Sequence, residues 1–314
     1  MPVPPLTARL AQIRSGERAP DTLAGVGPAD RRDRFLALLD VYDLSLAPLY
    51  TVGDAARLAG HPAVVALKAG LERDWLAELS AGPPPADLPA GAAAAMRAVA
   101  TRDRLPAVYR WLAREASWPQ VVRFLAVEGG PDGGFDDLVA LCQVGLSGTA
   151  KLELGHNYWD EMGDGAPDAV HTTLYERMVE AVGMPRIPRA ELPVEALERC
   201  ALGGLLATNR WLQPEMVGAL GMVELQAGPR CRLVLRAFER LGAPPGAYPF
   251  YQVHAEVDPR HGRDWLELAV GPLAAAHPGW GPRMVRGAWW RSRAGDALFA
   301  RLHRDLARGA MAAA

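Results

Sequence analysis

A short segment of the sequence carries side chains suited to metal chemistry: it reads His254-Ala-Glu-Val-Asp258-Pro-Arg-His261. Successive residues of an α-helix are turned by about 100°, so Asp258 and His261 would lie about 40° and about −20° from the direction of His254. Two imidazoles and one carboxylate on one narrow stripe suit a first-row transition metal. The alternative is a solvated polar face, because charged residues such as Arg260 are interspersed. Pro259 would kink the helix, which is tolerated more often at a functional site than in plain scaffolding.

A second acidic segment leads to a third histidine, His171. Three carboxylates precede it by three, seven and ten residues, namely Asp168, Asp164 and Glu161. If one helix ran through the segment, all three would lie within about 80° of the direction of His171. Glycine and proline residues interrupt such a helix, so each of the three carboxylates stays open as the partner of His171.

A third feature is a single carboxylate, Glu224, within the otherwise apolar stretch 218–227. A buried and unpaired carboxylate costs several kcal/mol, so this residue needs a partner. A metal ion would provide one. An arginine such as Arg210 or Arg230 is the alternative partner.

Helices must position these residues, because the apolar positions recur at intervals of three and four. Examples are the segments 35–42 and 65–76, whereas sustained alternation with a period of two is missing. We therefore predict an all-α protein. The stretch 82–91 is rich in proline and glycine and cannot be helical. It is expected to separate an N-terminal helical extension, residues 1–100, from a core, residues 101–314, of about seven helices.

The composition narrows the classes of partner. The chain has 314 residues, 34 of them basic and 36 acidic, so its net charge is only −2. Such a chain has no charge excess to hold it on phosphate backbones or anionic lipid, and we expect neither nucleic acid nor membrane as a partner. The 3 cysteines are widely spaced within apolar runs, which is typical of buried free thiols. No signal peptide and no long apolar segment is evident, so a cytoplasmic location is expected.

Taken together, the order and spacing of these features resemble the heme-oxygenase-like diiron oxidases, a family of iron-containing redox enzymes. An acidic residue precedes His171, Glu224 follows 53 residues later, and the set His254, Asp258 and His261 begins another 30 residues on. The phrase Trp159-Asp-Glu-Met-Gly-Asp-Gly is similar to the form found in members that oxygenate nitrogen. The resemblance covers roughly residues 105–310 and implies a heme-oxygenase-like helical bundle.

The resemblance also implies a cofactor of two ferrous ions, with O2 as a cosubstrate. The ligands that it implies are Glu161, His171, Glu224, His254, Asp258 and His261. Asp164 is the alternative to Glu161, because other members place the acid seven residues before the histidine. Some members add a carboxylate from an earlier core helix, for which Glu128 is the candidate; it could equally be a helix-end residue before a glycine stop.

The activity implied is O2-dependent oxidation of a small amine or amino-acid-derived substrate in natural-product biosynthesis, either N-oxygenation or an oxidative rearrangement. An external electron donor is the second expected partner, and a homodimer is one option for the oligomeric state. The alternative reaction is desaturation or carbon–carbon bond cleavage of an amino acid or fatty acid. Two further alternatives are a heme-binding or metal-free member of the same fold and a helical interaction module without catalysis.

Overall fold

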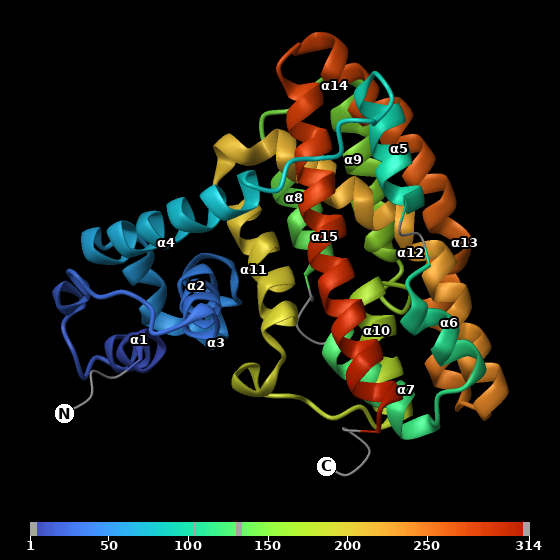
Figure 1. Ribbon diagram of the computed structural model, residues 1–314, viewed down its shortest axis with the longest axis horizontal. Coiled ribbons are helices and arrows are strands. Elements are labelled where there is room, and N and C mark those ends of the chain that lie inside the picture. Colours follow the sequence, from blue (N-terminus) through green and yellow to red (C-terminus); the bar gives the residue numbers. More distant parts are fainter. Residues whose placement is uncertain (1–4, 103–104, 130–133, 310–314) are drawn as a thin grey trace. The chain divides into compact units, whose positions relative to one another are not determined.

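The computed structural model describes residues 5–102, 105–129 and 134–309, and this part of the chain forms helices and no strand. The all-α prediction is therefore confirmed. The chain divides into two compact units (Figure 1). The first consists of Met1–Pro83 together with Pro188–Arg210, and the second of Pro84–Ile187 together with Trp211–Ala314. A segment from the middle of the sequence thus belongs to the same unit as the N-terminal helices.

The first unit is organised around one helix, α2. Its α-helices are α1 (Leu6–Arg14), α2 (Arg31–Leu46), α3 (Leu49–Val52), α4 (Pro62–Ser80) and α11 (Val194–Thr208). Helix α2 packs against α1, α4 and α11. Gly204 of α11 permits the close approach to α2, because a Cβ atom at this position would overlap the ring of Tyr42. The buried ring of Phe35 meets Trp75 of α4 edge to face, with 5.0 Å between the ring centroids.

A buried carboxylate, Asp33, joins α1 to the start of α2. It is 5% exposed and accepts hydrogen bonds from the backbone N–H groups of Leu6 at 2.9 Å and Thr7 at 3.0 Å, and from the Thr7 hydroxyl at 2.8 Å. The backbone N–H of Ala29 donates a further bond at 2.8 Å. Burial alone would raise the pKa of Asp33, but these hydrogen bonds outweigh it and hold the pKa below its usual value.

We expect Asp33→Asn to destabilise the protein by about 1.5–3 kcal/mol at neutral pH, because one amide oxygen cannot replace a carboxylate as the acceptor of these bonds. Since folding lowers the pKa of Asp33, its stabilisation is present above its unfolded pKa and is lost as pH falls through the folded value. The melting temperatures of wild type and variant should therefore approach each other as the pH falls from neutral to strongly acidic. A difference that stays constant with pH would contradict this account, and the exposed Asp21→Asn is the control.

The second unit is a bundle around the long helix α12. Its α-helices are α5 (Ala92–Arg102), α6 (Ala107–Arg114), α7 (Trp118–Glu128), α8 (Phe135–Cys142), α9 (Gly148–Glu161), α10 (His171–Val182), α12 (Gln213–Leu241), α13 (Tyr248–Asp264), α14 (Gly271–Ala276) and α15 (Trp280–Ala307). Helix α12 packs against α5, α6, α8, α13 and α15 (Figure 1). Short turns divide this bundle into more helices than the roughly seven that the sequence predicts.

Glycines set the distance between α12 and the neighbouring helix α15. A Cβ atom on Gly218 would overlap the carbonyl oxygen of Met284, and one on Gly287 would overlap that of Glu215. The Glu215 side chain is fully buried at this crossing and forms ion pairs with Arg283, at 2.7 Å, and with Arg286. Backbone contact and the ion pairs of the buried Glu215 with two partly exposed arginines therefore fix the two longest helices of the described chain against each other.

A π-helix, η7 (Trp265–Val270), continues directly from α13. The fully buried Trp265 donates a hydrogen bond from Nε1 to the carbonyl oxygen of Val217 at 3.0 Å, and Gly221 leaves room for its ring. This contact anchors the end of α13 to α12.

Among the described residues, no single helix is long and apolar enough to cross a membrane. In this part of the chain, only the bent pair Arg31–Leu46 and Leu49–Gly60 meets the criteria of length and composition, and only when the two helices are taken together.

Candidate metal centre

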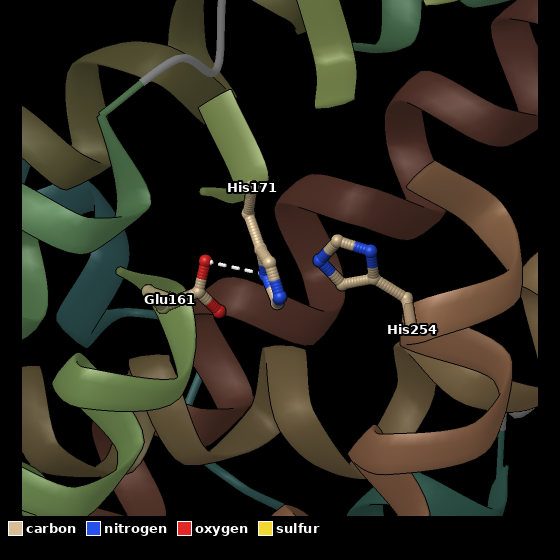
Figure 2. Close-up of side chains that lie close together, drawn as sticks. All are labelled: Glu161, His171 and His254. Carbon is tan, nitrogen blue, oxygen red and sulfur yellow. Dashed lines mark ion pairs between the residues drawn. The ribbon is translucent and has the colours of Figure 1, made fainter. Parts of the chain in front are cut away.

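One group of possible metal ligands consists of Glu161, His171 and His254 (Figure 2). Each offers a nitrogen or oxygen atom, and these atoms lie within 4.8 Å of one another. Glu161 Oε2 is 2.8 Å from His171 Nδ1, and the ring centroids of His171 and His254 are 4.6 Å apart. Figure 2 shows the His171 ring between the carboxylate of Glu161 and the ring of His254. The three side chains converge from α9, α10 and α13.

A tight turn brings Glu161 and His171 together, because Glu161 is the last residue of α9 and His171 the first of α10. Gly163 has a φ of 61°, and a Cβ atom there would lie 2.5 Å from the carbonyl carbon of Ala169. Asp164 also has a positive φ, 52°, which is uncommon for a residue other than glycine. The two ligands thus meet at the ends of two helices, and not along one continuous helix.

We expect Gly163→Ala to lower iron occupancy, because the added Cβ must push the turn away from Ala169 and disturb the approach of Glu161 to His171. Metal content after anaerobic loading with ferrous iron measures the effect, and circular dichroism should show an unchanged helix content. Gly155→Ala, on the preceding helix α9, is the control, since its Cβ would meet only Gln143 Oε1 at 3.6 Å. Full iron occupancy in Gly163→Ala would contradict the expectation.

The other group of possible ligands consists of Glu224, Asp258 and His261, all of them buried. Glu224 comes from α12 and the other two from α13. Glycines permit this close packing: a Cβ atom on Gly262 would lie 3.1 Å from the carbonyl oxygen of Glu224, and one on Gly228 3.0 Å from Pro259 Cδ. Pro259 lies within α13, which runs through it without a break.

Hydrogen bonds orient several of these ligands. Asn157, fully buried on α9, donates from Nδ2 to Glu224 Oε1 at 2.9 Å. His254 Nδ1 lies 2.6 Å from the carbonyl oxygen of Phe250, one turn earlier in α13. Since a carbonyl oxygen only accepts, Nδ1 carries the proton and the lone pair is on Nε2. The Phe250 ring also packs against His254, with 4.4 Å between centroids.

The charges of the site favour a bound cation. Burial, followed by repulsion from Glu224 and Glu161, raises the pKa of Asp258 well above its usual value. Burial and the neighbouring His171 lower the pKa of His254 and favour its neutral, metal-binding form. For His261, burial lowers the pKa, but Glu224 and Asp160 outweigh it and raise the pKa to about 9. A divalent cation would offset the crowding of the carboxylates.

Ligand atoms in both groups are buried and lack a hydrogen-bond partner, namely His171 Nδ1, His261 Nδ1 and Asp258 Oδ2. The His171 nitrogen is close to Glu161 at 2.8 Å but lacks hydrogen-bond geometry toward it. Buried polar atoms without partners are costly, and metal coordination would satisfy all three. The donor set of three imidazoles and three carboxylates therefore fits two first-row metal ions, with one group for each ion.

The alternatives left open by the sequence lie outside these two groups. Asp164 and Asp168 are exposed, and Asp168 forms an ion pair with Arg177. Glu224 is contacted by Asn157 and His261. Of its two candidate arginine partners, Arg230 lies over the ring of Phe299, with 4.8 Å to the centroid.

Glu128, the candidate extra carboxylate, also belongs to neither group. Its Oε1 lies 3.5 Å from the Tyr109 hydroxyl. Asp136, on α8, is a further carboxylate that interacts electrostatically with Glu161: burial raises its pKa, and repulsion from Asp137 and Glu161 adds to this effect. The sequence did not single out Asp136, Asn157 or Asp160, because their proximity to the ligands depends on how α8, α9, α12 and α13 pack.

Comparisons with known proteins show the family of this chain. The model of the family described as iron-containing redox enzyme matches residues 123–296, which include both ligand groups. The chain belongs to this family, as its motifs predict, and is thus an oxidoreductase with the expected heme-oxygenase-like helical fold.

The proteins similar to this chain include a curated relative and a solved structure. A nitrosourea synthase of Streptomyces achromogenes subsp. streptozoticus is 29% identical over 148 residues, which are 46% of this chain and 31% of that protein. The match therefore spans about a third of the relative. A CADD-like protein of unknown function from Nostoc punctiforme PCC 73102 shares the fold, with a TM-score of 0.52 and 17% identity over 67% of this chain and 95% of its own.

Proposed function

We propose that this protein is a non-heme diiron enzyme that uses O2 to oxidise a small amine or amino-acid-derived substrate. The observation that carries the proposal is the pair of neighbouring ligand groups, Glu161, His171 and His254 on one side and Glu224, Asp258 and His261 on the other. When bound, two ferrous ions would supply electrons for the reduction of O2. The burial of most of these ligands would keep bulk water from the reaction.

The surrounding residues have defined tasks in this proposal. Phe250 fixes the proton of His254 on Nδ1, and Asn157 restrains one oxygen of Glu224. The carboxylates of Glu224 and Asp258 would balance the charge of the cations. Glu161 and His171 would complete the ligand set where the ends of α9 and α10 meet.

N-oxygenation of a nitrogen-containing substrate is the reaction that we prefer. The similarity to a protein named nitrosourea synthase supports it. Insertion of one atom of O2 into a substrate, with reduction of the other to water, requires two electrons from outside the substrate. The proposal therefore includes an external electron donor. A place in natural-product biosynthesis and a cytoplasmic location belong to the same proposal.

Anaerobic loading with ferrous iron, followed by exposure to O2 with a panel of amines and amino acids, tests this function. Mass spectrometry should show a product heavier by one oxygen atom that carries the label from ¹⁸O2. A product lighter by two hydrogens, or one shortened by carbon–carbon cleavage, would replace N-oxygenation with the alternative reactions. No O2 consumption with any substrate, and no iron retained, would contradict an oxidase.

A further inference from the structure

Two histidines of the candidate metal centre differ in the partner of the nitrogen that faces away from the other ligands. His254 Nδ1 lies 2.6 Å from a neutral acceptor, the backbone carbonyl oxygen of Phe250. His261 Nε2 instead lies 2.5 Å from a carboxylate oxygen, Asp160 Oδ2. Asp160 itself is outside both ligand groups.

Asp160 is held firmly in this position. Its side chain is 10% exposed, and Arg260 Nη2 donates to the same oxygen, Oδ2, at 3.0 Å. His156, one turn earlier in α9, lies 3.8 Å from Oδ1. Arg260 is the residue before His261, so Asp160 contacts two consecutive side chains of α13 from the end of α9. The carboxylate thus has little freedom to turn away from the imidazole.

The two nitrogens of His261 have separate roles in this arrangement. A carboxylate accepts hydrogen bonds, so Nε2 carries a proton toward Asp160, and Nδ1 is the nitrogen that would offer its lone pair to a metal ion in place of a proton. Nδ1 is buried without a hydrogen-bond partner and lies 3.5 Å from Glu224 Oε2, within the group that includes Asp258. A negatively charged acceptor behind an imidazole makes the opposite nitrogen a stronger metal ligand than a neutral acceptor does.

We propose that Asp160 is a positioning residue that fixes the orientation of His261 and selectively strengthens metal binding by Glu224, Asp258 and His261. This inference rests on the proposed function, because it assumes that these residues bind a metal ion. Asp160 acts through His261 and does not itself bind the ion. The other group, with its neutral Phe250 partner, is independent of Asp160.

Anaerobic titration with ferrous iron in competition with a chelator tests the inference without reference to catalysis. Asp160→Asn retains an oxygen that accepts from Nε2 but removes the charge, whereas Asp160→Ala removes both. We expect Asp160→Ala to weaken one of the two iron sites by about 10- to 100-fold and Asp160→Asn to weaken the same site by less. The other site should stay within about twofold of wild type. Asp164→Asn, an exposed aspartate in the adjoining turn, is the matched control and should change neither site.

Repeating the titration in two further backgrounds assigns the affected site. The effect of Asp160→Ala should persist in the His254→Ala background and vanish in the Asp258→Ala background. An equal loss at both sites would show a merely structural role, and unchanged affinities would show no role; either result overturns the inference. If the wild type binds a single iron, the proposed diiron function fails. The role of Asp160 is still tested in that case: Asp160→Ala should lower the affinity for that iron, and an unchanged affinity would overturn the inference.

Discussion

Replacement of Glu224 by alanine is expected to reduce the iron bound per chain from two to one or none while the protein stays folded. The carboxylate is 4% exposed and belongs to the group with Asp258 and His261. Its loss leaves that group with two ligands. In the iron-free protein the same change removes a charge that repels Asp258 and raises its pKa, which offsets the loss of the attraction to His261 and of the hydrogen bond from Asn157.

Iron content after anaerobic loading, together with the melting temperature of the iron-free protein, measures this prediction. Glu256→Ala is the matched control, because Glu256 is exposed on α13 and outside both ligand groups. His254→Ala should lower iron content in the same way through the other group. Two irons per chain in Glu224→Ala would contradict its role as a ligand.

Gly287→Ala is expected to destabilise the protein by about 3 kcal/mol or more, because the new Cβ would overlap the carbonyl oxygen of Glu215. This oxygen cannot move away easily, because it belongs to the helix backbone and the Glu215 side chain is held by Arg283 and Arg286. Alanine in place of glycine would otherwise stabilise a helix by about 1 kcal/mol. The steric overlap is expected to outweigh this gain, so the free energy of unfolding should fall.

Chemical denaturation of the two variants Gly287→Ala and Gly281→Ala checks this prediction. Gly281 lies on the same helix, and its Cβ would make only ordinary contacts, at 3.6 Å to Ala92 and 3.7 Å to Ala274. Gly281→Ala should be neutral or slightly stabilising. A Gly287→Ala variant as stable as wild type would show that α12 and α15 can separate at little cost.

The sequence predicted the part of the site that depends on local geometry. His254, Asp258 and His261 share one helix, so their spacing alone places them on one face, and α13 does continue through Pro259. A resemblance to a family was needed to choose Glu161 among three carboxylates, because a continuous helix would have brought all three near His171. The structure ends α9 at Glu161 and leaves Asp164 and Asp168 exposed.

Other features depend on contacts between distant segments, which periodicity does not reveal. Asp160 meets His261 across 101 positions of the sequence, and Asn157 meets Glu224 across 67. Each of these polar residues resembles an ordinary surface residue until α9 packs against the ligand helices. Helix α11 joins the N-terminal helices for a similar reason: Gly204 fits against Tyr42, a contact that neither local sequence indicates.

The central claim, that the two ligand groups together hold a pair of iron ions, is tested most directly by Mössbauer spectroscopy of the full chain. The protein is loaded anaerobically with ferrous iron, freed of excess metal, and measured before and after exposure to O2. We predict two irons per chain that become an exchange-coupled ferric pair after oxidation. One iron per chain, or two irons that remain magnetically isolated, would contradict the claim.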